Sequence, residues 1–312
     1  MVVDTILFGD CRETLKEFDG KARTCVTSPP YYGLRDYGGE ESQIGQEQTP
    51  EEYIQNLVEV FRSVRDVLTD DGTLWVNIGD SYYNCRPGKG QALPKQTVSK
   101  TKQDLPDKCA KRGNKLEGLK EKDLIGIPWM LAFALRADGW YLRQDIIWHK
   151  PNPMPESVKD RCTKSHEYIF LLSKNRKYYY NNEAIKEPVK QDWGTRDRTK
   201  GKYHNPGTGL VPHSGLSKSY DRKNKRDVWT VTNKPYKGAH FAVYPPDLIE
   251  PCIKAGSEEG DIVLDPFMGS GTTALVSKSL NRHYIGCELH EDYGRLIQKR
   301  LSEKSFARLK LE

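Results

Sequence analysis

The segment with the clearest chemical meaning is a glycine-rich turn that reads Asp-Pro-Phe-Met-Gly-Ser-Gly-Thr-Thr at 265–273. It follows the apolar run 261–264, so a strand is predicted to end where the turn begins. Gly269 and Gly271 would let a ligand approach the backbone where a Cβ would obstruct it. Glu288 follows Asp265 by 23 residues, at the end of the next apolar run, where a carboxylate commonly accepts hydrogen bonds from ribose. No Gly-Lys-Ser/Thr follows the glycines, so the turn predicts a nucleoside ligand and not a nucleoside triphosphate.

A second turn, Ser28-Pro29-Pro30-Tyr31, follows the apolar run 22–27. Its prolines fix the backbone, and Pro30 has no N–H to donate. The Ser28 hydroxyl and the Pro29 carbonyl would therefore form two adjacent acceptors beside the Tyr31 ring. An aromatic face with two acceptors suits a planar base that carries an amino group. The simpler reading is that two prolines only end a strand.

Alternating strand and helix patterns position both turns. Apolar runs predict strands at 5–8, 22–27, 73–78, 142–148, 168–172, 261–265 and 283–288. Apolar residues at helical spacing predict helices over 51–68, 125–135, 247–256, 272–280 and 290–301. This alternation indicates an α/β fold with a mostly parallel sheet and helices on both faces.

Positive charge gathers in two segments of a chain whose net charge is +6. Residues 86–122 hold 11 Lys and Arg against 4 Asp and Glu, and residues 186–238 hold 13 against 5. Such clusters can bind a phosphate backbone, although a charge run alone also fits a solvated insertion. Aromatic residues within 186–238 favour nucleic acid. We take Lys223, Lys225 and Arg226 as the candidate DNA-binding residues.

Other classes of protein are excluded by composition. The longest apolar runs are far too short to span a membrane, and the first ten residues do not resemble a signal peptide. The 7 Cys are scattered with no Cys-x-x-Cys pair, which indicates reduced thiols and no structural zinc. We expect no metal and a cytoplasmic protein, either on the nucleoid or in a host cell if a phage encodes it.

Together these segments resemble the DNA amino-methyltransferases, which methylate exocyclic nitrogens with S-adenosylmethionine. Ser28–Tyr31 matches the catalytic tetrapeptide of that family, and Asp265–Thr273 matches its cofactor motif. The catalytic motif comes first and a long insert separates the two, as in the circularly permuted beta group. The resemblance implies a Rossmann-like methyltransferase fold with a catalytic domain at 1–185 and 239–312, a basic insertion at 86–122 within it, and a target-recognition region at 186–238.

The resemblance also implies roles for single residues. The cofactor pocket would be formed by Asp265, Pro266, Phe267, Gly269, Ser270, Gly271 and Thr272, with Glu288 on the ribose, Asp10 near the adenine and Phe241 near the methionine. Ser28 and Pro29 would accept hydrogen bonds from the target amine, with Pro30 completing the motif, and Tyr31 would stack on an extruded base.

The expected substrate is duplex DNA, and the expected partner is a cognate restriction endonuclease, with the enzyme a monomer or a homodimer. Ser28 favours cytosine N4 as the methylated atom, because Asp is commoner at this position in adenine-N6 enzymes. Adenine N6 stays open, since a hydroxyl or a carboxylate can accept from either amine. RNA methylation and a catalytically inactive DNA-binding homologue are the remaining alternatives.

Overall fold

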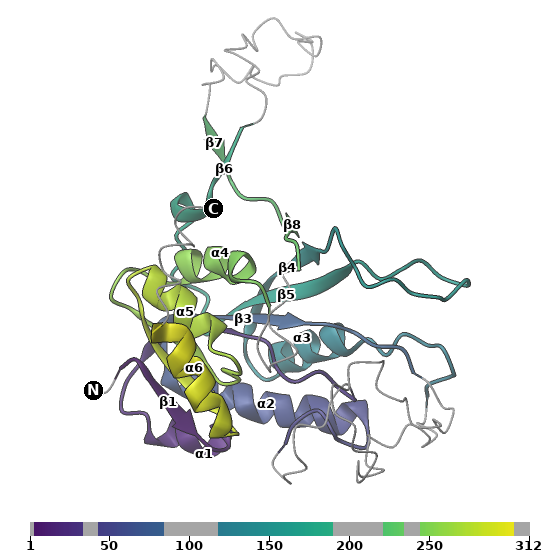
Figure 1. The fold of residues 1–312 in the computed structure, drawn as a ribbon, viewed down its shortest axis with the longest axis horizontal. Coiled ribbons are helices and arrows are strands. Elements are labelled where there is room, and N and C mark those ends of the chain that lie inside the picture. The colour runs from purple at the N-terminus through teal and green to yellow at the C-terminus, as the bar shows by residue number, and fades with distance from the viewer. Residues whose placement is uncertain (1–2, 34–42, 84–117, 190–220, 234–243, 303–312) are drawn as a thin grey trace, which may run out of the picture. The chain divides into compact units, whose positions relative to one another are not determined.

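The computed structural model of the chain describes residues 3–33, 43–83, 118–189, 221–233 and 244–302, and Figure 1 shows their arrangement. The main sheet has eight strands in the order β1-β10-β9-β2-β3-β5-β4-β8. Their bounds are β1 Thr5–Phe8, β2 Ala22–Thr27, β3 Leu68–Ile78, β4 Tyr141–His149, β5 His166–Ser173, β8 Val228–Thr230, β9 Ile262–Asp265 and β10 His283–Glu288. Every strand predicted from the apolar runs is present; β3 begins earlier than expected, and β8 was not predicted.

The direction of the strands confirms the predicted α/β class. The strands β1, β10, β9, β2 and β3 run parallel to one another. Only β5 runs against both of its neighbours, β3 and β4. The carboxyl ends of β9, β2 and β10 therefore meet at one edge of the sheet, where open α/β sheets bind their ligands.

Six α-helices and two short 3₁₀-helices accompany the strands in the described part of the chain. Their bounds are α1 Cys11–Thr14, η1 Leu15–Glu17, α2 Pro50–Val67, α3 Ile127–Ala137, η2 Glu183–Ile185, α4 Pro246–Gly256, α5 Thr272–Ser279 and α6 Asp292–Ser302. The longest, α2, begins at a capping box in which Thr49 and Glu52 satisfy each other's backbone N–H groups.

Helices α2 and α4 cover opposite faces of the sheet. Cys25 and Leu74 belong to the main core cluster together with the buried residues of α2. Their strand neighbours Thr24 and Thr73 instead face α4, where a Cβ on Gly256 would lie 2.6 Å from the Thr24 hydroxyl. Because successive side chains of a strand point to opposite faces, both faces of the sheet are covered by helices, as the sequence predicts.

Residues Asn181–Arg226 form a second compact unit, and Met1–Tyr180 with Asp227–Glu312 form the first. Within the second unit β6 (Glu187–Pro188) pairs with β7 (Arg222–Lys223). This unit overlaps the recognition region predicted at 186–238. However, Val228–Thr230 from that region forms β8 and pairs with β4 in the main sheet.

Most of the basic insertion predicted at 86–122 lies outside the described residues. No helix among the described residues is long and apolar enough to cross a membrane.

Candidate cofactor pocket and base site

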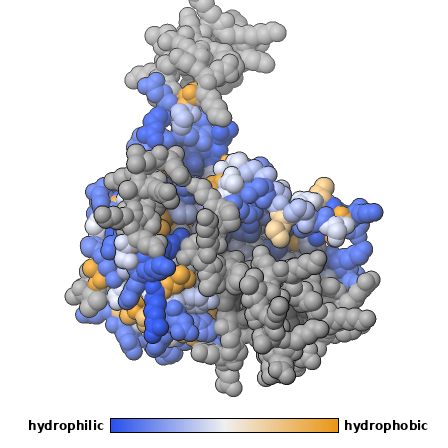
Figure 2. Space-filling view, in the orientation of Figure 1, coloured by the Kyte–Doolittle hydropathy of each residue, from blue (hydrophilic) through white to orange (hydrophobic). Residues whose placement is uncertain are grey.

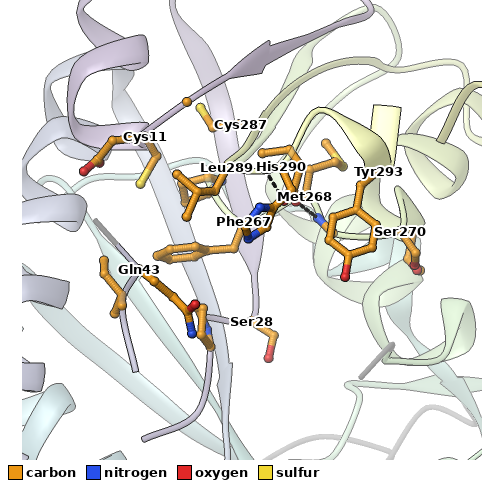
Figure 3. Close-up of a pocket in the computed structure, with 18 of the residues that line it drawn as sticks. Cys11, Ser28, Gln43, Phe267, Met268, Ser270, Cys287, Leu289, His290 and Tyr293 are labelled. Atoms are coloured by element: carbon orange, nitrogen blue, oxygen red, sulfur yellow. Dashed lines mark hydrogen bonds between the residues drawn. The ribbon is translucent and has the colours of Figure 1, made fainter. Parts of the chain in front are cut away.

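A pocket opens at the carboxyl ends of β1, β2, β9 and β10. Its volume is about 920 Å³, part of it open to solvent. Figure 3 shows Ser28, Phe267, Ser270 and Tyr293 around it, although they come from distant parts of the sequence. Nine predicted site residues contribute to the lining: Asp10, Ser28, Pro30, Pro266, Phe267, Gly269, Ser270, Thr272 and Glu288. The structure thus brings the serine of the catalytic motif to the same pocket as the glycine-rich turn.

Asp265 stands behind this pocket and is only 1% exposed. Its carboxylate accepts hydrogen bonds from the hydroxyls of Thr27 (2.6 Å), Thr273 (2.6 Å) and Tyr244 (3.0 Å), and from the backbone N–H of Phe267 (3.0 Å). Burial raises the pKa of Asp265, and these hydrogen bonds act in the opposite direction. Asp265 therefore connects the end of β2 to the glycine-rich turn and shapes the pocket indirectly. Tyr244 itself lines the pocket, although it was not among the residues predicted to form it.

Glu288 faces the pocket from the end of β10. Its two carboxylate oxygens accept the backbone N–H groups of Gly269 (2.8 Å) and His290 (3.1 Å), which Figure 3 marks with dashed lines. Burial raises the pKa of Glu288 to about 7. A carboxylate has about four acceptor positions, so it can still accept from a hydroxyl donor of a ligand.

Asp10 also lines the pocket, as the N-cap of α1. Its carboxylate accepts from the backbone N–H of Arg12 at 2.9 Å and forms an ion pair with the Arg12 guanidinium at 2.5 Å. Although burial acts to raise it, the contacts with Arg12 hold the pKa of Asp10 below its usual value. Asp10 is thus a charged acceptor beside the pocket.

The glycine-rich turn is held from behind by α6. Gly271 has a φ of +78°, and a Cβ there would lie 2.9 Å from Ile297 of α6. From the same helix, Arg300 donates to the Ser270 carbonyl (3.1 Å), the Ser270 hydroxyl (2.8 Å) and the Thr272 hydroxyl (3.0 Å). Sequence reasoning missed Arg300, because a single Arg near the end of a predicted helix carries no local signature.

Replacing Arg300 should therefore loosen the turn. In Arg300→Met we expect the affinity for the cofactor to fall by about 10-fold, since hydrogen bonds to a charged donor contribute about 1.5–3 kcal/mol. Calorimetric titration would measure this, with Arg295→Met, an exposed position on the same helix, as the matched control. Equal affinities for the two variants would show that the turn keeps its shape without Arg300.

The catalytic motif Ser28–Tyr31 divides between the pocket and the core. Ser28 and Pro30 line the pocket, whereas Pro29 is buried. The Pro30 carbonyl accepts from the Tyr53 hydroxyl at 2.8 Å, which attaches the motif to α2. Tyr31 is not among the residues that line the pocket, and it donates its hydroxyl hydrogen to Glu167 at 2.7 Å. Phe241 lies outside the described residues.

The donors and acceptors of this pocket fit a nucleoside cofactor. Besides the free acceptor positions of Glu288, the Nε2 atom of His290 is buried and has no hydrogen-bond partner among the described residues. His290 also lines the pocket, so a ligand there would satisfy it. Among the described residues, no group of His, Cys, Asp and Glu is arranged to hold a metal ion.

The model of the N6/N4 DNA methylase family matches residues 22–299, which include both motifs and most of the pocket lining. The chain belongs to this family. The prediction of a DNA amino-methyltransferase is thereby confirmed, and so is its cofactor, because this family takes its methyl group from S-adenosylmethionine.

Two relatives that match this methylase over most of their own length are bacterial type II methyltransferases. M.SmaI of Serratia marcescens is 47% identical over 302 residues, covering 95% of this chain and 90% of the relative. M.XycI of Xanthomonas campestris pv. cyanopsidis is 47% identical over 298 residues, covering 95% and 87%.

Solved structures show the same fold. The cytosine-N4-specific PvuII DNA methyltransferase has a TM-score of 0.61 at 17% identity, covering 99% of this chain and 91% of its own. The TTHA0409 protein of Thermus thermophilus, solved with S-adenosyl-L-methionine, has a TM-score of 0.58 at 22% identity, covering 98% and 94%.

Proposed function

We propose that this methylase transfers a methyl group to N4 of a cytosine extruded from duplex DNA. The observation that carries the proposal is the position of Ser28, whose motif ends β2 beside the pocket of the glycine-rich turn. A base amine held at Ser28 would face a cofactor bound in that pocket. Extruding the base costs a few kcal/mol of unstacking.

In the cofactor pocket, Glu288 would accept from the ribose hydroxyls and Asp10 would lie near the adenine. Pro266, Phe267, Gly269, Ser270 and Thr272 form the wall on the side of the turn, with Asp265 and Gly271 shaping it from behind. When bound, S-adenosylmethionine supplies an electrophilic methyl group on a positively charged sulfur.

At the base, Ser28 and the Pro29 carbonyl would each accept one hydrogen of the target amine, while Tyr31 stacks on the ring. The lone pair of such an amine is delocalised into the base. Holding both hydrogens favours a more pyramidal nitrogen whose lone pair can attack in line. Positioning supplies most of the rate, because it removes the entropy of a bimolecular encounter.

Cytosine is favoured over adenine by the first residue of the motif, which is Ser28. Cytosine-N4 enzymes of this family commonly carry Ser there, and adenine-N6 enzymes commonly carry Asp. Adenine N6 stays the alternative substrate, reached by the same mechanism.

The second unit, Asn181–Arg226, would bind the DNA backbone. Its surface near β6 and β7 is largely hydrophilic in Figure 2. Within the unit, Glu187 forms ion pairs with Lys223 (3.4 Å) and Arg226 (2.6 Å), and both cations are more than 40% exposed. These cations, with Lys225, could exchange the carboxylate of Glu187 for phosphate.

Neutralising Lys223, Lys225 and Arg226 together should flatten the salt dependence of DNA affinity. Each phosphate that the protein no longer neutralises reduces the slope of log K against log salt by about 0.9, so a decrease of about 2–3 is expected. Glu187→Gln is the matched variant and should tighten binding, because it removes the competing carboxylate. An unchanged slope in the triple variant would mean that these side chains are only solvated and do not contact phosphate.

Nucleoside mass spectrometry tests the proposed reaction. Unmethylated duplex DNA of high sequence complexity would be incubated with the protein and methyl-labelled S-adenosylmethionine. Labelled N4-methylcytosine is the expected product, whereas labelled N6-methyladenine would keep the mechanism and change the base. Label in RNA but not in DNA would contradict the proposal that DNA is the substrate. Absence of label from both, with the cofactor bound, would indicate an inactive homologue.

The relatives named as type II methyltransferases support a role in restriction and modification. We expect a cognate endonuclease that cuts the same DNA site when it is unmethylated. Purification of the native complex and sedimentation would distinguish a monomer from a homodimer.

A further inference from the structure

Glu167, the second residue of β5, is connected to the catalytic motif although it is distant from it in sequence. Its Oε2 atom accepts from the Tyr31 hydroxyl at 2.7 Å and from the Asn77 amide at 3.3 Å. Its Oε1 atom is paired with the Lys150 ammonium. The side chains of Glu167 and Lys150 are only 15% and 16% exposed. Three strands, β3, β4 and β5, therefore supply one buried cluster around the tyrosine of the motif.

The donors and acceptors in this cluster indicate where the Tyr31 hydrogen goes. Lys150 can only donate, so the Glu167 oxygen that it pairs with accepts. The Tyr31 hydroxyl donates its single hydrogen to the other Glu167 oxygen, because the Asn77 oxygen is more distant at 3.4 Å.

The Tyr31 ring is also confined on its side. A Cβ added to Gly79, just after β3, would lie 2.7 Å from the Tyr31 ring and 3.4 Å from the Glu167 side chain. Only glycine leaves room for both groups at this position. The ring is therefore held by packing and its hydroxyl by Glu167.

We propose that Glu167 is a positioning residue for methyl transfer: it holds the Tyr31 hydroxyl and thereby fixes the Tyr31 ring where it stacks on the extruded base. Lys150 pairs with the Glu167 carboxylate and holds it in place. The inference rests on the proposed role of Tyr31. Neither Glu167 nor Lys150 contacts the base or the cofactor in this assignment.

A double-mutant cycle between Glu167→Gln and Tyr31→Phe tests the proposal. Methyl transfer to unmethylated duplex DNA would be measured in single turnover at saturating S-adenosylmethionine, with cofactor affinity measured by calorimetry. Losing a hydrogen bond to a charged acceptor should slow Glu167→Gln about 10- to 100-fold. Cofactor affinity should stay within about 2-fold, because Glu167 does not line the pocket. In the Tyr31→Phe background, Glu167→Gln should add almost nothing.

The matched control is Asp138→Asn. Asp138 is 12% exposed and pairs with Arg62 at 2.5 Å, so this variant removes a similarly buried carboxylate from an ion pair that touches neither Ser28 nor Tyr31. We expect it to leave the single-turnover rate unchanged. If Glu167→Gln lowers the Tm, Glu167→Asp replaces it in the cycle. The Asp side chain keeps the charge but is one methylene shorter, so its carboxylate lies farther from the Tyr31 hydroxyl, and we expect the same loss of rate.

Two outcomes would overturn the inference. A wild-type rate of methyl transfer in the Glu167 variant would show that Glu167 has no positioning role. Effects that simply add in the double variant would mean that Glu167 does not act through Tyr31. The proposed function fails separately: a Tyr31→Ala variant with wild-type turnover would contradict the role of Tyr31 itself, whatever Glu167 does.

Discussion

Replacing Tyr31 with Ala should reduce methyl transfer by at least about 100-fold while cofactor affinity changes by less than about 2-fold. Stacking between an aromatic ring and a base contributes about 1–3 kcal/mol, or about 5- to 150-fold in rate. The variant also removes the hydroxyl through which Glu167 holds this residue, which adds to the loss. Cofactor affinity should survive because Tyr31 does not line the pocket.

Single-turnover rates and calorimetric titration with S-adenosylmethionine would measure the two effects. Tyr32→Ala is the control: its hydroxyl donates to the Gln48 carbonyl at 3.2 Å, and its ring packs against Tyr53. The Tyr32→Ala variant should retain most of the wild-type rate of methyl transfer. Parallel losses of turnover and cofactor affinity in Tyr31→Ala would refute the separate role of the ring at the base.

Replacing Glu288 with Ala should weaken S-adenosylmethionine binding by about 10- to 150-fold, because each hydrogen bond to a charged acceptor contributes about 1.5–3 kcal/mol. The wild-type affinity should also depend on pH. Burial raises the pKa of Glu288 to about 7 in the free protein. Ribose hydroxyls that donate to the carboxylate favour its ionised form, so binding below pH 7 must release a proton.

The dissociation constant should therefore rise up to tenfold for each pH unit below 7 and stay level above it. Glu288→Ala should lose this dependence, while Glu259→Ala, an exposed glutamate before β9, should keep both the affinity and the pH profile. Calorimetry between pH 5.5 and 8.5 would measure all three proteins. A wild-type affinity in Glu288→Ala would contradict the ribose assignment.

Several features of this methylase could be predicted from the sequence because they depend on local patterns. Apolar runs and helical spacing indicated the strands and helices, since each element must bury one side. The order of strand, turn and helix also placed the two motifs. Parallel strands bring their carboxyl ends to one edge, and Ser28 and Gly269 line one pocket there.

Other features depend on which strands become neighbours. The antiparallel β5 inserts between β3 and β4, and this places Glu167 beside Tyr31, 136 residues away in sequence. Packing of α6 against the turn likewise brings Arg300 to Ser270. Asp265 was expected in the pocket wall. It is instead buried behind the wall, where its carboxylate accepts hydrogen bonds from four donors.

The sequence by itself thus determined the family, the cofactor motif and the catalytic turn, because residue types at short spacing carry that information. Only the tertiary structure decided which side chains hold those turns in place. Charged and polar groups such as Glu167, Arg300 and Asp265 acquire their roles from partners far along the chain. Burial then makes those partnerships strong, since a buried polar group without a partner would be costly.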